Sequence, residues 1–541
     1  MAELVLHGPK MKSSIEMTTL GEFMFNRSDK FKSNICQVDA NKKKTESYSS
    51  VKQRSVKLAV ALKNKLAPGD VVLTCSKNTL DAVIPIIASF YLGAIVANLD
   101  ASLGVRMSRN LISLVTPKII FVEEASVAMI EESLQETNLH PEIVVLGSST
   151  KYQTFSALVR PSPKEKSFRP VKVGIHQTAA MFFSSGSSGF PKAICHSHYS
   201  LLQVFYKTLR FIVYDLFKIY RKCEYVEDVV LYFGTFYWIS STIFLTLAFV
   251  DGSTRVFCDN TDGQTILQII QDYKVTTLFT VPILTYTLTN FEHSTRYDTS
   301  TVRLVLCDGT SMDPAQIQRI NTKFRYAVTC LVYGLTETGL VSMFDIEKDA
   351  ELAKFNLTSS GKLAPQIRLK IADLSSDQLL GPNERGEICI ASPSMMLGYY
   401  RGDCTAAFDN NRYLKTGDVG YYDEEGCLYV TDRIKEIFQY QSWHIVPSCI
   451  EAVLMEHPAV KDAAVFGIPH GKDGEVPAAC VVVDRNHIVS AKELDKFVAD
   501  RVAEVEKLRG GITFMEALPK TPNGKVLRNE VRNFVMNSEK K

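Results

Sequence analysis

A loop rich in serine and glycine follows the apolar run that ends at Phe183, and it closes with Pro191-Lys192. Small residues let backbone N–H groups approach anionic oxygens, serine hydroxyls add donors, and a lysine adds positive charge. This composition favours a phosphate-holding loop, although a flexible surface loop has a similar composition. The spacing differs from the Gly-x-x-x-x-Gly-Lys-Ser/Thr loop, because two residues separate its glycines and a proline precedes its lysine. The candidate phosphate ligands are Ser184, Ser185, Gly186, Ser187, Ser188, Gly189 and Lys192.

A second string, Tyr333-Gly334-Leu335-Thr336-Glu337-Thr338, places an aromatic ring, a hydroxyl and a carboxylate close together. Tyr333 can stack on a purine, Gly334 allows close backbone approach, and Thr336 can donate to phosphate. Glu337 can hold Mg²⁺ through its carboxylate oxygens. Taken alone, the string is better explained by coincidence.

Two further strings lie toward the C-terminus. In Tyr413-Leu414-Lys415-Thr416-Gly417-Asp418, a carboxylate after glycine is suited to accepting both hydroxyls of a ribose, although an ordinary turn aspartate looks the same. In Pro519-Lys520-Thr521-Pro522-Asn523-Gly524-Lys525, a turn rich in proline and glycine presents a lysine. The four strings in this order are far more specific than any one of them.

With these strings the chain resembles the adenylate-forming superfamily, which includes acyl- and aryl-CoA synthetases such as 4-coumarate–CoA ligase, and insect luciferases. The resemblance covers nearly the whole chain. It rests on the serine- and glycine-rich loop ending in Pro-Lys, Tyr-Gly-Leu-Thr-Glu, Thr-Gly-Asp, Asp-Arg-x-Lys-Glu and Pro-Lys-Thr-x-x-Gly-Lys. It implies an enzyme that uses ATP and Mg²⁺ to convert a carboxylic acid into an acyl-adenylate, and then transfers the acyl group to coenzyme A.

The resemblance also implies a role for each matching residue on the ATP side. Residues 184–192 hold the phosphates, Asp418 and Arg433 bind the ribose, and Tyr333 with Gly334 lines the adenine. Thr336 serves the phosphates and Glu337 binds Mg²⁺.

The resemblance assigns catalysis to Lys525 together with Thr336 and Glu337. Lys525 matches a lysine that bridges the attacking carboxylate and the α-phosphate, where a fixed cation stabilises transition-state charge. Lys435 matches the hinge about which the C-terminal domain rotates between the two half-reactions.

Several positions depart from the family pattern on the thiol and acyl sides. The family has lysines and a glycine where this chain has Gln439, Gln441 and Ser442, so thiol transfer is less firmly predicted than adenylation. The region that forms the acyl pocket in the family reads as bulky and apolar, which suits a fatty acid or an aryl acid. Its candidate residues are Phe236, Tyr237, Trp238, Asp308 and Gly309.

The elements that must position these residues are predicted from hydrophobic periodicity. We expect helices over 55–66 and 80–92, and strands over 71–74, 95–98, 119–122 and 143–146. The alternation predicts an α/β fold with mostly parallel sheets. Turn signals between 367 and 430 predict a β-rich lobe. We therefore expect a large N-terminal adenylation domain over 1–433 and a small, mobile α+β C-terminal domain over 434–541.

One uncharged run, Val229 to Val250, is long enough to cross a bilayer. Its first five residues are β-branched or aromatic and precede Gly234, and a helix can begin near Trp238. A continuous span would have no flanking cluster of lysine or arginine. We expect a strand, a turn and a buried helix there, and no transmembrane span.

Composition narrows the class of protein and its partners. The 541 residues include 61 basic and 59 acidic ones, a net charge of +2 that argues against a nucleic-acid partner. Twelve cysteines without a CxxC pair suit reduced thiols in an intracellular protein, and the Cys195–His198 run lacks a fourth metal ligand. We find no secretory signal and no C-terminal Ser-Lys-Leu, so we expect a cytoplasmic monomer, with a peroxisomal location permitted by the family.

Three functions remain open at this point. The first is an acyl-CoA synthetase acting on a carboxylic acid. The second is an adenylating enzyme with another second step, such as luciferase-like oxidation. The third is a non-catalytic relative that binds nucleotide or acyl ligand.

Overall fold

The molecule is described from a computed structural model of the 541-residue chain. The structure describes all residues except 1–3, 12–16, 185–191, 213–227, 292–293, 309–311, 313, 346–347, 377, 441–442, 471–474, 486, 503, 521–525 and 539–541.

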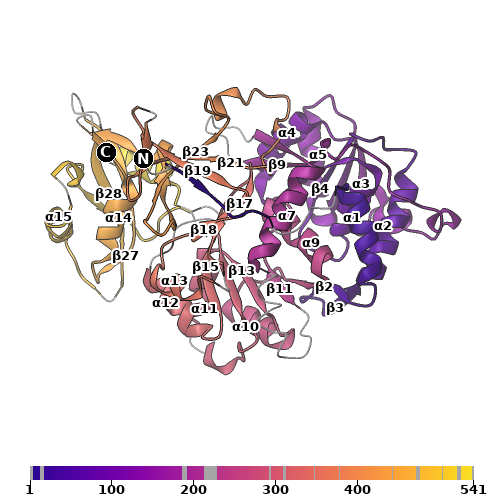
Figure 1. The fold of residues 1–541 in the computed structure, drawn as a ribbon, viewed down its shortest axis with the longest axis horizontal. Helices are drawn as coiled ribbons and strands as arrows, with labels where there is room; N and C mark the ends of the chain where they lie inside the picture. Colours follow the sequence, from indigo (N-terminus) through magenta and orange to yellow (C-terminus); the bar gives the residue numbers. More distant parts are fainter. Residues whose placement is uncertain are drawn as a thin grey trace.

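Two mostly parallel sheets form the body of the molecule (Figure 1). The first has the order β22-β10-β9-β5-β4-β6-β7-β8, and its pairs are parallel from β9 to β8. Its central strands are buried along their whole length, as expected where helices cover both faces. The strands are β4 Val71–Cys75, β5 Ile95–Leu99, β6 Ile119–Glu123, β7 Glu142–Leu146, β8 Gln153–Thr154, β9 Thr178–Ser184, β10 Lys192–Ser197 and β22 Gly398–Tyr399.

The second sheet has the order β15-β14-β13-β11-β12-β2-β3 and is parallel except at its last pair. Sequential strands separated by helices produce this parallel arrangement. The strands are β2 Ile35–Asp39, β3 Lys44–Ser47, β11 Val229–Tyr232, β12 Thr254–Phe257, β13 Thr277–Thr280, β14 Leu304–Cys307 and β15 Val328–Leu331.

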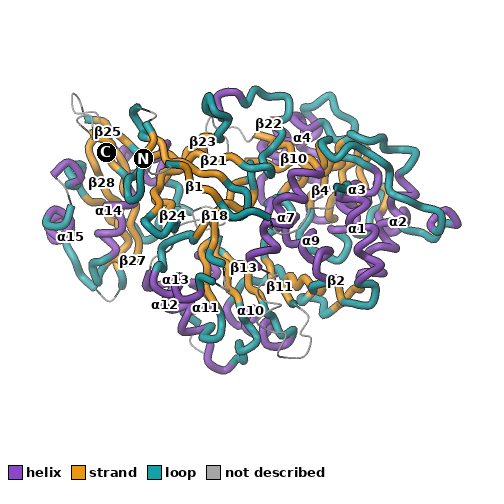
Figure 2. Tube along the Cα trace, in the orientation of Figure 1, coloured by secondary structure: helices purple, strands orange, loops and turns teal. Residues whose placement is uncertain are grey.

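A shared layer of helices packs between the two sheets (Figure 2). It consists of α1 Leu20–Lys30, α2 Tyr48–Leu62, α3 Val83–Leu92, α7 His198–Ile212 and α9 Ile239–Asp251. Helices α4 Gly104–Val115, α5 Val127–Gln135 and α6 Phe155–Leu158 accompany the first sheet, and α10 Gly263–Asp272, α11 Pro282–Thr289, α12 Pro314–Lys323 and α13 Ala350–Phe355 the second. The strand and buried helix expected within 229–250 are present as β11 and α9. Among the described residues, no helix is long and apolar enough to cross a membrane.

A lobe of antiparallel strands lies beside the two sheets and confirms the β-rich region expected after 367. Its sheet runs β1-β19-β21-β23-β24 with β20 on β19, and a small sheet β16-β17-β18 joins it to the body. The strands are β1 Val5–His7, β16 Tyr333–Leu335, β17 Gly339–Met343, β18 Lys362–Leu363, β19 Arg368–Ala372, β20 Leu379–Leu380, β21 Gly386–Ala391, β23 Leu414–Tyr422 and β24 Leu428–Arg433.

The C-terminal region follows a short 3-10 turn, Ile434–Glu436, and has sheets of its own. They contain β25 Phe438–Tyr440, β26 Trp443–Ile445, β27 Val460–Pro469, β28 Glu475–Val483 and β29 Ile512–Phe514, with α14 Pro447–Met455, α15 Ala491–Ala499 and α16 Arg528–Ser538. Its buried apolar clusters contain residues from 438 to 535, and no described residue belongs both to them and to the clusters of the body. The α/β class with a large body and a small α+β region is as predicted, and the boundary at 433/434 stays a prediction.

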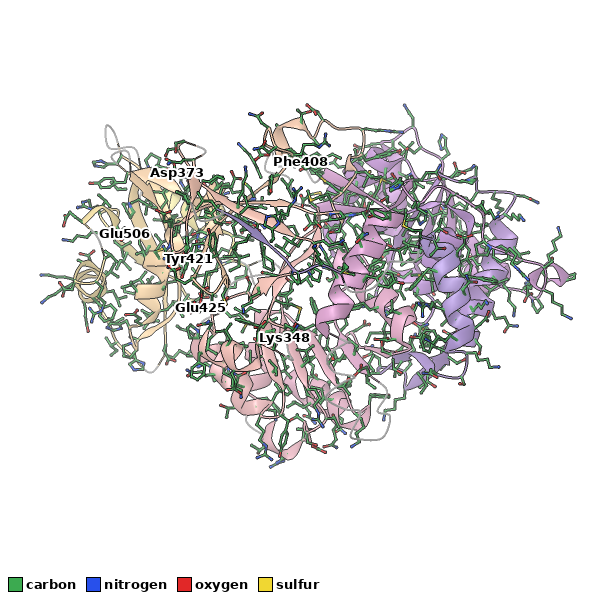
Figure 3. All side chains as sticks on the ribbon, in the orientation of Figure 1. Lys348, Asp373, Phe408, Tyr421, Glu425 and Glu506 are labelled. Carbon is green, nitrogen blue, oxygen red and sulfur yellow. The ribbon has the colours of Figure 1, made fainter. Side chains whose placement is uncertain are left out.

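The small region meets the β-rich lobe through specific side chains (Figure 3). Arg385 packs with its guanidinium 5.7 Å from the ring centre of Tyr421 and donates to Cys449 Sγ of α14 at 2.7 Å. The labelled Tyr421 lies on the lobe side of this junction and Glu506 on the other side.

Candidate active site

The predicted phosphate loop joins the antiparallel pair β9 and β10, with Ser184 opposite Lys192 in the register. Ser185, Gly186, Ser187, Ser188 and Gly189 lie outside the described residues, as does the side chain of Ser184. The Lys192 ammonium lies 4.2 Å from the ring centre of Tyr399, a cation–π contact that the sequence did not predict. Lys192 is therefore held at the mouth of the loop by an aromatic ring from β22.

The residues predicted to hold the nucleoside come together from three strands. The Tyr333 hydroxyl of β16 donates to Asp418 Oδ2 of β23 at 2.7 Å, and Arg433 Nε of β24 donates to Asp418 Oδ1 at 2.9 Å. Asp418 and Arg433 are direct partners in the β23–β24 register. Asp418 is buried, and Arg433 is 40% exposed. A carboxylate oxygen has lone pairs for more than one donor, so Asp418 keeps acceptor capacity for ribose hydroxyls.

The loop between β16 and β17 carries Thr336 and Glu337, both half-buried. Burial raises the pKa of the Glu337 carboxyl, while the charges of Arg433 and Lys192 lower it and that of Asp418 raises it. These residues come from strings far apart in the sequence, and their charges all act on the Glu337 carboxyl. Arg433 contacts Asp418 directly, and the roles of Lys192, Glu337, Asp418 and Arg433 toward a nucleotide stay predictions.

Two contacts hold this loop through its backbone and were missed by sequence reasoning. His196 Nε2 lies 2.7 Å from the Thr336 carbonyl oxygen, so it must carry the proton and donate. The Met396 N–H donates to the Glu337 carbonyl oxygen at 2.7 Å. Burial lowers the pKa of His196 to about 4, so its ring is neutral near pH 7. A contact to a backbone carbonyl requires no particular residue type, so no sequence pattern signals it.

Glu337 offers the kind of ligand that Mg²⁺ takes from a protein when phosphates supply the rest of its shell. Among the described residues, no group of three or more His, Cys, Asp or Glu side chains could hold a metal ion. His198 Nδ1 instead accepts from the Leu20 N–H at 3.2 Å, which gives the Cys195–His198 run structural contacts. Mg²⁺ commonly takes one or two carboxylates and completes its shell with phosphates and water, and the desolvated Glu337 carboxylate fits that role.

The residues predicted to form the acyl pocket differ in their burial and contacts, and their role in binding an acyl group stays a prediction. Phe236 is buried, with its ring 5.3 Å from the guanidinium of Arg255. Tyr237 stacks on Phe183 at the end of β9, with ring centres 6.1 Å apart, and Trp238 is 41% exposed. Asp308 is half-buried at the end of β14, and Gly309 lies outside the described residues. Tyr237 thus lies against the strand that leads into the predicted phosphate loop.

The residues predicted for the hinge and the thiol side are described only in part. Lys435 is exposed within the Ile434–Glu436 turn. Gln441 and Ser442 lie outside the described residues, as does the Gln439 side chain. Lys525 also lies outside them.

Arg528, three residues beyond Lys525 in the sequence, contacts residues on both sides of the predicted hinge residue Lys435. Its guanidinium pairs with Glu436, lies 3.7 Å from Asp432 Oδ1 and grips both oxygens of Glu451 at 3.0 and 2.6 Å. The chain that follows the predicted catalytic lysine is therefore fixed to the segment that follows β24.

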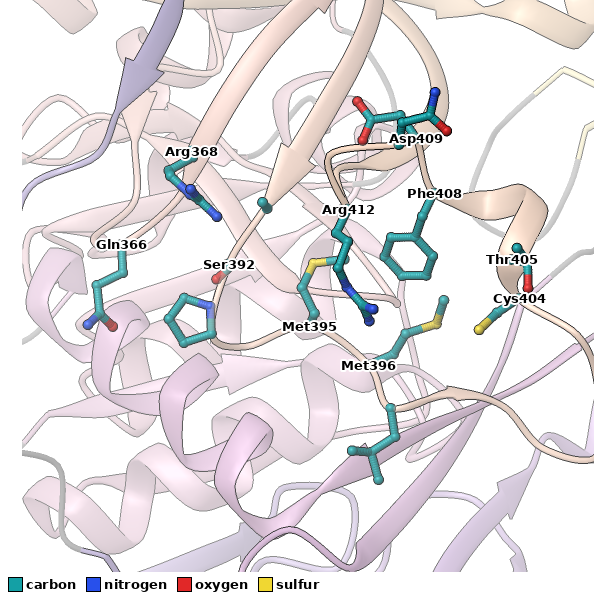
Figure 4. A pocket seen from close by; sticks show the side chains of 14 residues that line it. Gln366, Arg368, Ser392, Met395, Met396, Cys404, Thr405, Phe408, Asp409 and Arg412 are labelled. Carbon is teal, nitrogen blue, oxygen red and sulfur yellow. The ribbon is translucent and has the colours of Figure 1, made fainter.

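A cavity of about 840 Å³ opens beside the segment 392–397, which also contacts the loop between β16 and β17 through Met396 (Figure 4). Met395, Met396 and Phe408 supply apolar side chains, and Arg368 and Arg412 supply positive charge. None of the predicted site residues lines this cavity. It therefore lies outside the predicted site.

Comparison with protein families gives two matches. A family model described as AMP-binding enzyme matches residues 25–400, and one described as AMP-binding enzyme C-terminal domain matches residues 449–525.

Comparison with known proteins gives relatives along most of the chain. Luciferin 4-monooxygenase from Nipponoluciola cruciata is 29% identical over 502 residues, covering 90% of this chain and 89% of that protein. The 4-coumarate–CoA ligase of Pinus taeda is 28% identical and covers 95% of this chain and 94% of that protein.

Two solved structures indicate the same fold. The luciferase-like enzyme from the nonluminescent mealworm Zophobas morio is 45% identical with a TM-score of 0.76, covering 80% of this chain and 100% of that one. The amide bond synthetase McbA from Marinactinospora thermotolerans is 23% identical with a TM-score of 0.84, covering 95% and 99%.

Proposed function

The chain belongs to the AMP-binding enzyme family of adenylate-forming enzymes, and from this we propose that it joins a carboxylic acid to coenzyme A at the expense of ATP. In the first step a carboxylate oxygen attacks the α-phosphorus, giving acyl-adenylate and pyrophosphate. In the second the thiol of coenzyme A takes the acyl group, releasing AMP and a proton. The observation that carries the proposal is the joining of Tyr333, Asp418 and Arg433 beside Glu337.

The proposed roles follow from charge. A carboxylate must approach a polyanion, so the protein has to offset their repulsion and align them. Asp418 and Arg433 fix the ribose, Thr336 donates to phosphate, and Lys192 balances phosphate charge. Glu337 would hold Mg²⁺, which would neutralise charge on the phosphates. Lys525, delivered by the small domain, stabilises charge between the carboxylate and the α-phosphate.

We propose a fatty acid or an aryl acid as the substrate. Tyr237, which stacks on Phe183 at the end of β9, and the partly exposed Trp238 favour an apolar acyl group over a small charged one. The test uses the full chain with ATP, Mg²⁺ and a panel of such acids, and it measures pyrophosphate release with and without coenzyme A. Pyrophosphate together with an acyl-thioester is the expected result.

The Lys525→Ala variant tests the catalytic assignment. We expect ATP–pyrophosphate exchange to fall by about 10²–10³-fold, the range for loss of one preorganised donor or charge. Lys461→Ala, an exposed lysine of the same small domain, is the control and should retain full exchange. Equal exchange in wild type and Lys525→Ala would refute the role of this lysine.

A luciferase-like second step is the alternative that the relatives favour. Luciferin 4-monooxygenases are among them, and the 45% identical enzyme is luciferase-like although its source is nonluminescent. Pyrophosphate release without thioester, accompanied by light with luciferin and oxygen, would support this step. ATP binding without pyrophosphate release from any acid would instead indicate a non-catalytic relative.

A further inference from the structure

Lys207 on α7 is a fully buried lysine that the proposed chemistry does not use. Its side chain is 2% exposed, and its ammonium donates to the Ser394 hydroxyl at 2.6 Å and to the Thr338 carbonyl oxygen at 3.0 Å. The Ser394 hydroxyl in turn donates to the same carbonyl at 2.9 Å. Lysine, serine and carbonyl therefore form a closed triangle in the interior.

The triangle completes a set of contacts on the catalytic loop. The carbonyl of Thr336 accepts from His196, that of Glu337 accepts from the Met396 N–H, and that of Thr338 accepts from Lys207 and Ser394. Three consecutive carbonyls are thus held by buried donors. The Thr336 and Glu337 side chains remain half-buried, and the Glu337 carboxyl faces the charges of Lys192 and Arg433.

Helix α7 also presses on the end of this loop. Gly339 has φ of +68°, and a Cβ there would lie 2.5 Å from a methyl carbon of Val204. Val204 and Lys207 are three residues apart, so they share one face of the helix. On that face, Val204 packs closely against Gly339, and Lys207 donates a hydrogen bond to the Thr338 carbonyl oxygen.

A charged amine is a costly choice for an anchor with neutral partners. Burial of an ammonium without a carboxylate is unfavourable, and burial lowers the pKa of Lys207 to about 7. A neutral donor would satisfy one carbonyl at lower cost. The lysine provides several hydrogens from one atom, so it can bind Thr338 and Ser394 together.

We propose that Lys207 is a positioning residue for adenylation, and that it fixes through Thr338 the backbone that aims Thr336 and Glu337 at the nucleotide phosphates and Mg²⁺. This inference rests on the proposed adenylation for its catalytic consequence, but not for its structural part. Lys207 does not contact the nucleotide in this proposal. It acts through the loop.

The test compares Lys207→Met with Thr208→Val. Thr208 is the next residue of α7 and is also buried. In the part of the chain that the structure describes, its hydroxyl bonds within the helix, donating to the Val204 carbonyl oxygen at 2.7 Å. Hydrogen–deuterium exchange of peptides covering 333–343 measures how firmly the loop is held. We expect about tenfold faster exchange in Lys207→Met and no change in Thr208→Val.

The kinetic readout is the Mg²⁺ concentration that gives half-maximal ATP–pyrophosphate exchange. We expect it to rise several-fold in Lys207→Met, with a lower maximal rate, and to stay unchanged in Thr208→Val. If Lys207→Met does not fold, Ser394→Ala removes one side of the triangle and should show the same two effects more weakly.

Each outcome tests one part of the proposal. Unchanged loop exchange in folded Lys207→Met overturns the anchoring role. Faster loop exchange with an unchanged Mg²⁺ requirement and rate overturns the positioning role in catalysis. If loop exchange is faster in Lys207→Met, the anchoring role of Lys207 is upheld. If the wild type also forms no pyrophosphate from any acid, the proposed function is refuted while the anchoring role stands.

Discussion

Asp418 is the residue on which the proposed nucleoside site depends, because its two oxygens accept from Tyr333 and Arg433. We expect Asp418→Asn to raise the KM for ATP by about 10–100-fold, the range for losing hydrogen bonds to a charged acceptor. If its carboxylate receives the ribose hydroxyls, 2′-deoxy-ATP should be a poorer substrate than ATP for wild type. The variant should discriminate much less between the two. Equal discrimination in both proteins would place the 2′-hydroxyl elsewhere.

Lys207 also predicts a pH dependence of stability. Its pKa is lowered to about 7 in the folded protein from 10.5, so the unfolded chain binds more protons between these values. Folding is then favoured as pH rises above 7, and the cost of burying the charge is fully present below 7. We expect wild type to gain stability relative to Lys207→Met from pH 7 to 9, by at most about 1.4 kcal/mol per pH unit.

Urea unfolding at several pH values measures this difference. His196 is the neighbouring titratable group whose pKa responds to the Lys207 charge, and with a pKa of about 4 it stays neutral throughout this range. A difference that does not vary with pH would mean that Lys207 keeps its charge, or loses it, in both states.

At the level of elements, the first residue of α16 joins this helix to β24, to the turn Ile434–Glu436 and to α14. Arg528 is the shared partner of Asp432, Glu436 and Glu451, all mostly buried. Removing it takes away the cation that these three mostly buried acidic side chains share, so we expect Arg528→Met to destabilise the C-terminal region by about 3 kcal/mol.

Arg532, one turn later on α16, provides the matched control. It pairs with Glu475 at 2.7 Å, and both side chains are about 30% exposed. We expect Arg532→Met to cost less than about 1 kcal/mol. Urea unfolding followed through Trp443 in a Trp238→Phe background measures both, and equal costs would contradict a special role for Arg528.

At the level of the whole molecule, the body and the C-terminal region have separate cores. The chain has two tryptophans, Trp238 in the body and Trp443 in the small region. We expect Trp443→Phe and Trp238→Phe variants to report different unfolding midpoints, since two cores need not unfold as one unit. Mg²⁺ and ATP should raise the free energy of unfolding reported by Trp238 by about 2.7 kcal/mol at a concentration 100 times the Kd, and the midpoint should rise with it. If the two variants report the same midpoint, both without nucleotide and with it, the body and the C-terminal region unfold as a single cooperative unit.

The sequence determined the residue types at the site and the order of the elements. Lys192, Glu337, Asp418 and Arg433 stand in short strings whose chemistry can be read directly, and buried strands such as β4 follow from continuous apolar runs. The uncharged run 229–250 was correctly divided into β11 and α9, because β-branched residues and a glycine precede the helix. These features are local, so neighbouring residues are enough to define them.

Only the tertiary structure decided which groups support those residues. Tyr399 lies against Lys192. His196 and Lys207 donate to carbonyl oxygens more than a hundred residues away, and Arg528 pairs with Glu436. Such contacts join side chains to a backbone or to distant charges, and they leave no periodicity or spacing in the chain. Their partners are fixed by the packing of α7, the two sheets and the small domain, which no local pattern encodes.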